Sequence, residues 1–167
     1  MEAQLNHWYL LFCKPQQHLR AEWQLSNQNF TCFNPARPVQ KTIRRVTKVV
    51  SEPLFPNYLF IQLNGLSNWQ ALRSTRGVSK VVSFNGAPAI VEDEIIHSLK
   101  IQCDKSYNQE PQALYQAGER VIITEGCFNN IEAIVKASKA EDRVLLLLQL
   151  LNGTQTIELP LAHIARA

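Results

Sequence analysis

The residues with the greatest chemical reactivity do not gather into a catalytic or metal-binding pattern. The four histidines share no ligand-like spacing, and no two of the four cysteines form the close pair that a zinc or thioredoxin-like redox site requires. They are His7, His18, His97 and His163, and Cys13, Cys32, Cys103 and Cys127. The sequence also contains no phosphate-cradling glycine loop and no nucleophile elbow. We therefore expect a binding protein without enzymatic activity, cofactor or metal, whose thiols are mostly buried or inert.

Charge is distributed unevenly along the chain. Residues 1–102 hold 11 Lys and Arg against 6 Asp and Glu, a net charge of +5, whereas residues 103–167 hold 6 against 8, a net charge of −2. The stretch from Arg37 to Val50 contains five of the basic side chains and no acid. Such a stretch either solubilises an exposed face or contacts nucleic-acid phosphate. The asymmetry favours a front half that meets an anion.

Length and composition describe a globular protein. A chain of 167 residues with 46% hydrophobic residues can form one domain or two small ones with a real core. The longest apolar run, Val144 to Leu148, is far too short to span a membrane, and the N-terminus lacks the pattern of a secretory signal. We expect a cytoplasmic protein with reduced thiols.

The stretch from Ser51 to Leu63 is the element around which the front half is organised. Pro53 and Pro56 hold the residues before them extended, so the strand itself should begin near Asn57. Side chains alternate along a strand. One face then carries Leu59, Ile61 and Leu63, and the other carries Tyr58, Phe60 and Gln62. Two aromatic residues on the second face indicate either a strand buried on both sides or a binding surface that something covers.

The surrounding segments predict an α+β fold, an antiparallel sheet with helices against it. We expect strands over residues 7–12, 30–33, 78–84 and 89–91, a basic hairpin over residues 37–50, and helices over residues 17–26, 68–73 and 92–100. Ser67 is the expected N-cap of the second helix, and Asn85-Gly86 is a strong tight-turn signal.

The last third of the chain is ambiguous. Residues 103–116 have no clear period and read as a linker at the point where the charge reverses. Strands are expected over residues 121–124 and 154–159. Between them, Phe128, Ile131, Ile134 and Val135 fit a helical stripe, while the leucine-rich run over residues 143–151 is compatible with a helix or a strand. Leucine favours the helix, so local propensity conflicts with an all-β reading of this region.

Several motifs resemble the NusG family of transcription elongation factors. They are Trp8-Tyr9, Phe55-Pro56-Asn57-Tyr58-Leu59-Phe60, Arg76-Gly77-Val78, and the region from Gly118 to Phe128. The resemblance covers essentially the whole chain after Asn6. It is closest to the family's specialised antiterminators, and it implies an N-terminal NusG-like domain over residues 1–102, a linker over residues 103–116, and a C-terminal KOW-type domain over residues 117–167.

The resemblance implies two binding surfaces on the N-terminal domain. The clamp helices of the RNA polymerase β′ subunit would contact Phe12, Phe55, Tyr58 and Phe60. The β gate loop would contact Asn68, Trp69 and Gln70, which replace the family's His-Thr-Thr run. A non-template DNA strand exposed at a specific pause element would contact Lys14, Gln24, Asn27, Gln28, Thr75, Arg76 and Gly77. Gln24 and Asn27 stand where the family pattern has a histidine and an arginine.

The resemblance also implies that the C-terminal domain changes fold. An α-helical hairpin would cover the polymerase surface in the autoinhibited protein, and on release it would become a five-stranded β-barrel that binds a small-subunit ribosomal protein. The interdomain contacts would come from Glu52, Arg143, Ile131, Val135, Leu145 and Leu148, with an ion pair between Glu52 and Arg143. The expected protein is a monomeric antitermination factor that suppresses pausing and termination and couples transcription to translation. The alternatives are a general NusG-like factor with a permanent β-barrel tail, or a KOW module that binds nucleic acid or the ribosome.

Overall fold

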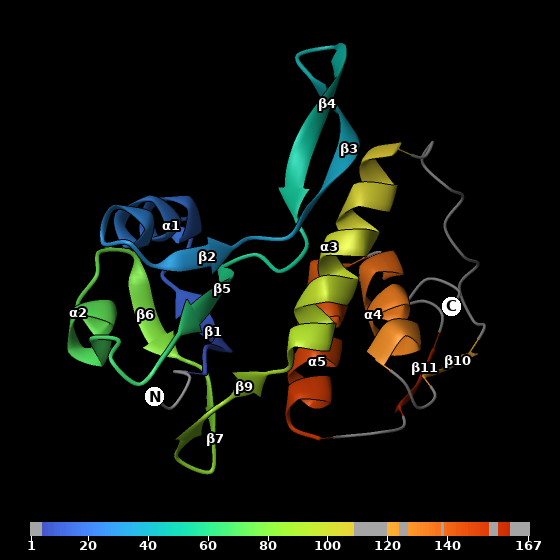
Figure 1. Cartoon of the computed structure of the whole chain (residues 1–167). Coiled ribbons are helices and arrows are strands. Elements are labelled where there is room, and N and C mark those ends of the chain that lie inside the picture. Colours follow the sequence, from blue (N-terminus) through green and yellow to red (C-terminus); the bar gives the residue numbers. More distant parts are fainter. Residues whose placement is uncertain (1–4, 109–119, 124–126, 138, 154–156, 161–167) are drawn as a thin grey trace. The chain divides into compact units, whose positions relative to one another are not determined.

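The computed structural model describes residues 5–108, 120–123, 127–137, 139–153 and 157–160 (Figure 1). The chain forms two compact units, residues 1–34 with 56–96 and residues 35–55 with 97–167. Each unit has its own strands and helices. The domain limits expected from the sequence stay a prediction, because compactness within one structure is not a measure of independent folding.

An antiparallel sheet is the frame of the first unit. Its strands lie in the order β2 (Thr31–Phe33), β5 (Tyr58–Leu63), β1 (His7–Cys13) and β6 (Val78–Val81), and β9 (Ile90–Val91) also pairs with β1. β1 and β5 pair from His7 opposite Leu63 to Phe12 opposite Tyr58. The predicted α+β class and the predicted central strand are confirmed. This strand begins one residue later than expected, after Asn57, whose left-handed φ of 68° is outside the β region.

Two helices, α1 (His18–Asn27) and α2 (Trp69–Arg73), bury one face of this sheet. Their contribution to the core is Ala21, Leu25 and Leu72. The sheet contributes Leu11, Cys13, Leu59, Ile61, Leu63, Val78 and Val81. The alternation predicted for β5 is therefore correct for its aliphatic face. Ten such side chains are buried in one cluster, so this face forms a hydrophobic core that stabilises the unit.

Two local predictions for the first unit were wrong in detail. The N-cap of α2 is Asn68, whose Oδ1 accepts a hydrogen bond from the Ala71 amide at 3.0 Å, while the Ser67 hydroxyl accepts one from the Asn64 amide at 2.9 Å. The strand expected over residues 78–84 is divided into β6 and β7 (Ser83–Phe84), and β7 pairs with β8 (Ala87–Pro88). The predicted tight turn is confirmed, because the φ angles of Asn85 and Gly86 are 52° and 80°.

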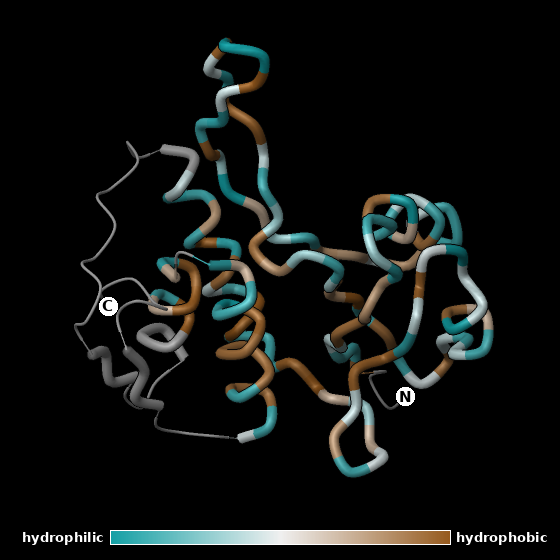
Figure 2. The backbone as a smooth tube through the Cα atoms, turned by 180° about the vertical axis from the view of Figure 1, so that it is seen from behind, coloured by the Kyte–Doolittle hydropathy of each residue, from teal (hydrophilic) through white to brown (hydrophobic). Residues whose placement is uncertain are grey.

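The basic stretch forms a long hairpin in the second unit. β3 (Ala36–Ile43) and β4 (Val46–Pro53) pair without interruption, and the turn consists of Arg44 and Arg45 with φ angles of 51° and 66°. Hydrophilic and hydrophobic residues are mixed along both strands (Figure 2). The hairpin prediction is thus confirmed. A turn with two positive φ angles matches the twist of the strands, although arginine is an unusual residue for it.

The remaining described elements of the second unit are mainly helical. They are residues 97–108 of α3 (Asp93–Asn108), then α4 (Cys127–Lys136), α5 (Ala140–Leu151), and the paired strands β10 (Arg120–Ile123) and β11 (Ile157–Pro160). Helix α3 extends to Asn108, so the linker does not begin at Cys103; its expected remainder, residues 109–116, lies outside the described residues. The leucine-rich run is a helix here. The structure shows one arrangement of the tail and so does not test a change of fold.

No helix within the described residues is both long and apolar enough to cross a membrane.

Candidate functional site

A shallow pocket lies where α1 approaches the loop that follows α2. Its volume is about 310 Å³. The lining residues are Gln24, Gln28, Ala71, Ser74, Thr75 and Arg76. Two amides, two hydroxyls and one guanidinium therefore surround the opening, a polar set suited to hydrogen bonds with a nucleobase or a phosphate.

Gly77 holds this loop against α1. Its φ is +95°, and a Cβ at this position would lie 2.9 Å from the Gln17 carbonyl oxygen and 3.0 Å from the Ala21 amide nitrogen. Only glycine allows both the backbone conformation and the close approach. The Gly77 carbonyl accepts a hydrogen bond from the Lys14 amide at 2.8 Å, so the end of β1 is joined to the same loop.

Hydrogen bonds orient the side chains on the wall of the pocket. The buried Thr75 donates its hydroxyl hydrogen to the Ala71 carbonyl at 2.8 Å. Gln28 Nε2 donates both to Thr75 Oγ1, at 3.0 Å, and to the Gln24 carbonyl, at 3.2 Å. Thr75 is thus a supporting residue, whereas Gln24 and Gln28 present amide groups to the pocket.

The aromatic face of the sheet carries the residues expected to bind polymerase. Phe12 and Tyr58 lie opposite each other in β1 and β5, both half-buried, with ring centroids 5.2 Å apart. The Lys80 ammonium lies 5.9 Å from the Phe12 ring, within range of a cation–π interaction. Partial burial raises the pKa of the Tyr58 hydroxyl. Phe60 is fully buried, with its ring 6.0 Å from that of Phe33.

The three residues expected at the β gate loop have different surroundings. Asn68 caps α2, and Trp69 packs against the core with its ring edge-on to Tyr9 at 5.0 Å. Gln70 has an exposed side chain. Asn68 is exposed as well, but Asn68 and Trp69 both have structural roles, so Gln70 is the exposed residue of the three whose side chain has no described structural role.

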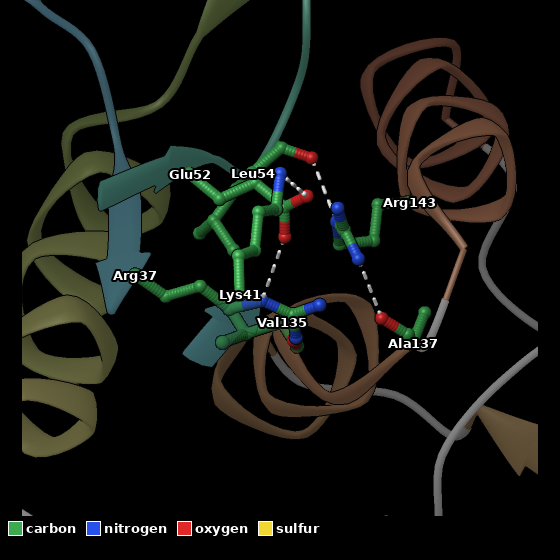
Figure 3. Close-up of polar contacts among 7 residues, drawn as sticks. All are labelled: Arg37, Lys41, Glu52, Leu54, Val135, Ala137 and Arg143. Carbon is green, nitrogen blue, oxygen red and sulfur yellow. Dashed lines mark hydrogen bonds and ion pairs between the residues drawn. The ribbon is translucent and has the colours of Figure 1, made fainter. Parts of the chain in front are cut away.

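In the second unit, a buried arginine joins α5 to the segment after the hairpin (Figure 3). Arg143 is 1% exposed, and it donates from Nε to the Leu54 carbonyl at 2.7 Å and from Nη1 to the Ala137 carbonyl at 2.8 Å. Burial, and after it the charge of the nearby Arg37, lower its pKa from 12.5 to about 10, although Glu52 and the acids at the start of α5 oppose the shift. Arg143 remains a cation near neutral pH.

Glu52 lies in the same cluster but contacts other cations (Figure 3). Its carboxylate forms ion pairs with Arg37 at 3.7 Å and with Lys41 at 3.6 Å. Arg37 also donates to the Val135 carbonyl at 3.3 Å, so this pair reaches the end of α4. Glu52 and Arg143 therefore interact through the electrostatic field, while their described contacts are with different partners.

The other tail residues expected at a domain interface differ in exposure. Ile131 and Val135 on α4 are buried, Leu148 is half-buried, and Leu145 is 46% exposed. The fully buried leucines of α5 are Leu146 and Leu147. Phe128 belongs to α4, but its side chain lies outside the description.

Comparison with known proteins identifies the family. Residues 6–100, more than half of the chain, match the family described as "Transcription termination factor nusG". The chain belongs to the NusG family. Membership in a family of transcription factors, together with relatives of the same kind, supports the expectation that this NusG-family protein is not an enzyme.

Curated relatives carry the name "Transcription termination/antitermination protein NusG". The protein of Helicobacter pylori strain J99 is 28% identical over 115 residues, which cover 68% of this chain and 65% of the relative. The protein of Rickettsia felis is 24% identical over 173 residues, which cover 95% of this chain and 88% of the relative. The match to the H. pylori protein thus spans slightly less than two thirds of its length. A solved structure titled "Domain interaction in Thermotoga maritima NusG" is 19% identical, and the match covers 74% of this chain and 75% of that one. Its TM-score is 0.45, which is too low to support an argument about fold.

Within this NusG-family chain, the structure brings together four of the seven residues expected to bind DNA. Gln24, Gln28, Thr75 and Arg76 line the pocket. Gly77 supports the loop and Lys14 is bonded to it through the backbone, whereas Asn27 is exposed on α1 and does not line the pocket. Their contacts with DNA stay a prediction. Two further lining residues were not predicted from the sequence: Ala71, which lies within α2, and Ser74, which follows it. Their nearness to Thr75 along the chain was the available signal.

Across the described residues, no three His, Cys, Asp or Glu side chains gather in a way that could hold a metal ion.

Proposed function

We propose that this NusG-family protein is a transcription elongation and antitermination factor that binds RNA polymerase and the exposed non-template DNA strand at a specific pause element. In this role it suppresses pausing and termination. The observation that carries the proposal is the pocket formed by Gln24, Gln28, Thr75 and Arg76, which come from two separate segments of the chain. Arg76 offers a positive charge for a phosphate, and the two amides offer donors and acceptors for a base edge.

The polymerase surface of the proposal is the aromatic face of the sheet. Half-buried Phe12 and Tyr58 expose part of their rings and offer an apolar surface for the clamp helices of the β′ subunit. In this proposal the fully buried Phe60 and Phe55 become part of the surface when the protein opens. Gln70, with its exposed side chain, is the residue best suited to the β gate loop.

We further propose that the protein is a specialised antiterminator of the RfaH type. In this proposal the helical tail covers the polymerase surface in the free protein, and after release it refolds into a KOW barrel that binds a small-subunit ribosomal protein. The helical state of α4 and α5 supports the first half of this cycle. The buried Arg143 and the Glu52 ion pairs would stabilise the closed state.

The second candidate is a general NusG-like factor whose tail is always a β-barrel. It is favoured by the relatives, which are named NusG at 22–28% identity. Both candidates bind RNA polymerase, and the fold of the tail in the intact protein separates them.

Elongation assays with purified RNA polymerase test the proposed function. The full chain should bind paused elongation complexes and shorten the pause, and Arg76→Ala should weaken this binding several-fold because a phosphate contact is lost. Arg73→Ala is the matched control, since Arg73 is an exposed arginine of α2 that does not line the pocket. Failure of the unaltered protein to bind elongation complexes would exclude the function. Equal binding by the two arginine variants would exclude the pocket as the DNA site.

A further inference from the structure

The end of the β3–β4 hairpin, residues 40–49, is exposed along its whole length. This hairpin end contains the apolar side chains Ile43, Val46 and Val49, which are 47%, 53% and 68% exposed. The two strands nevertheless stay paired as far as Ile43 opposite Val46. A ribbon with this exposure adds little to a hydrophobic core, so burial does not explain its length.

Cations gather at the hairpin end. Lys41 lies directly opposite Lys48, so the two side chains share one face of the ribbon, and Arg44 and Arg45 form the turn next to them. Lys41 forms an ion pair with Glu52, whereas Arg44, Arg45 and Lys48 form none with the acids that the structure describes. Because like charges opposite each other destabilise paired strands, this arrangement weakens the hairpin.

The turn consists of residues that its backbone disfavours. Arg44 and Arg45 have φ angles of 51° and 66°, in the left-handed region that glycine and asparagine adopt more readily. Two-residue hairpin turns with two positive φ angles strongly prefer Asn-Gly. Strain of this kind tends to persist where it serves a function. Here the strained residues are two adjacent cations at the tip, which indicates that their charges meet a ligand.

We propose that the hairpin end binds double-stranded DNA by entering the major groove of a B-form duplex. A two-stranded β-ribbon fits this groove, and the phosphates along its rims would meet Arg44, Arg45 and Lys48. Ile43 and Val46 would contact apolar groups inside it, such as thymine methyl groups. The inference does not rest on the pocket beside α1, because the hairpin belongs to the other compact unit.

Other anionic ligands fit the hairpin end less well. Proteins bind single strands largely by stacking bases on aromatic side chains, and residues 36–53 contain no aromatic residue. Membrane surfaces are bound through a broad apolar face with Trp, Phe or Leu, whereas residues 40–49 carry only isolated isoleucine and valine side chains. The major groove of an RNA duplex is deep and too narrow for side chains to read. B-form DNA requires none of these missing features.

Binding of a labelled DNA duplex to the full chain tests this inference. Fluorescence anisotropy follows a duplex of about 20 base pairs, two helical turns, over a series of salt concentrations. Each phosphate contact should contribute about −0.9 to the slope of log affinity against log salt. An RNA duplex of the same sequence should bind more weakly. One of the two DNA strands alone, and vesicles that contain phosphatidylserine, complete the set of probes.

A turn variant removes the charges without removing the turn. Arg44→Asn combined with Arg45→Gly supplies the residues that this turn prefers, so thermal unfolding should occur no earlier than in the unaltered protein. Duplex affinity at low salt should still fall at least about tenfold, and the salt slope should become shallower by about 2. Arg44→Lys combined with Arg45→Lys keeps both charges and should keep the slope.

The matched control is Arg73→Gln combined with Lys105→Gln. It removes two exposed cations from α2 and α3 and should leave the slope and the duplex affinity close to those of the unaltered protein. An equal loss in the control would mean that overall charge attracts the duplex, and the inference would be wrong.

The remaining outcomes separate the inference from the proposed function. Unchanged duplex binding by the turn variant would overturn it, and so would equal affinity for the RNA duplex, which has no open major groove. Binding of the vesicles but not of the duplex would assign the hairpin end to a membrane instead. If the single strand fails to bind while the duplex responds to the turn variant as expected, the hairpin inference stands and the pocket is not a DNA site.

Discussion

At the scale of single residues, Gly77 is the position where the backbone determines the candidate DNA pocket. Its φ is +95°, and a Cβ at this position would lie 2.9 Å from the Gln17 carbonyl oxygen and 3.0 Å from the Ala21 amide nitrogen. Any other residue would therefore require the loop to shift. Gly77→Ala should lower the free energy of unfolding by about 1–3 kcal/mol, because a non-glycine residue is strained in this region and the loop must also move. Urea titration measures the change.

Gly65→Ala is the control for that substitution. A Cβ at Gly65 meets nothing within 4 Å, and its φ is not in the left-handed region. We expect a change of a few tenths of a kcal/mol at most. If both variants were equally stable, the loop would not depend on the close approach at Gly77, and the geometry of the pocket would need another explanation.

Two buried thiols make the stability of the protein sensitive to alkaline pH. Burial raises the pKa of Cys13 to about 11 from its ordinary value of 9.0, and the charge of Glu22 adds to the shift. Burial likewise raises the pKa of Cys103 to about 11. Because the unfolded chain releases these protons near pH 9 while the folded chain keeps them, stability is complete below pH 9 and falls as the pH rises towards 11.

Urea midpoints at about pH 8 and about pH 10 measure this loss of stability. The double variant Cys13→Ala, Cys103→Ala should lose less stability over the same interval, since the lysines and tyrosines that titrate nearby are unchanged. An equal loss in both proteins would mean that the thiols contribute nothing. The expectation of buried, inert cysteines is confirmed for these two residues; Cys32 is only half-buried, although burial raises its pKa to about 12.

At the scale of elements, the sequence predicted those whose apolar period is unambiguous. The alternation in β5 predicted a strand and the basic stretch predicted a hairpin, and the structure confirms both of these secondary structures. The leucine-rich run of α5 permits two, because a nearly uniform apolar segment has no period. What separates helix from strand there is packing against distant residues, such as the bond between Arg143 and the Leu54 carbonyl, and no local pattern contains that information.

The helices of the tail are short, so their stability should depend on the rest of the chain. α4 has 10 residues and α5 has 12, lengths at which isolated helices are marginal in water. If the tail changes fold, isolated residues 103–167 should lose helical signal per residue in circular dichroism relative to the same segment in the full chain, with a gain of β signal. The same helical content in both settings would contradict the change of fold, and a β-rich tail in the full chain would favour the general NusG-like factor.

At the scale of the whole molecule, the residues of the candidate DNA site could be predicted from the sequence, but their detailed geometry could not. Resemblance placed Gln24, Gln28, Thr75 and Arg76 in one functional group, and the structure brings them to one pocket. The orientation of the Gln28 amide could not be predicted, because it depends on a hydrogen bond across 47 residues of chain and on the hydroxyl direction of Thr75. The expected Glu52–Arg143 ion pair stays a prediction, and the described ion pairs of Glu52 are with Arg37 and Lys41.

The charge of Glu52 is therefore expected to hold a cluster of cations together. Without it, Arg37, Lys41 and the buried Arg143 would remain in one region with no central acid. Glu52→Gln keeps the shape and removes the charge. Because the side chain is 30% exposed, the loss of stability should be modest, about 0.5–1 kcal/mol. Arg143 should then be held less firmly, and amide hydrogen exchange in α5 should become faster.

Glu132→Gln is the matched control, because it removes the same charge from an ion pair with Lys136 within α4 at 2.6 Å. It should leave exchange in α5 unchanged. If the closed tail limits access to the polymerase surface, Glu52→Gln should also increase binding to RNA polymerase about two- to fivefold, the equivalent of the same 0.5–1 kcal/mol, whereas Glu132→Gln should not. Faster exchange without tighter binding would show that the tail opens but does not compete with polymerase. No difference between the two variants would show that the acid at position 52 has no special part in closing the tail.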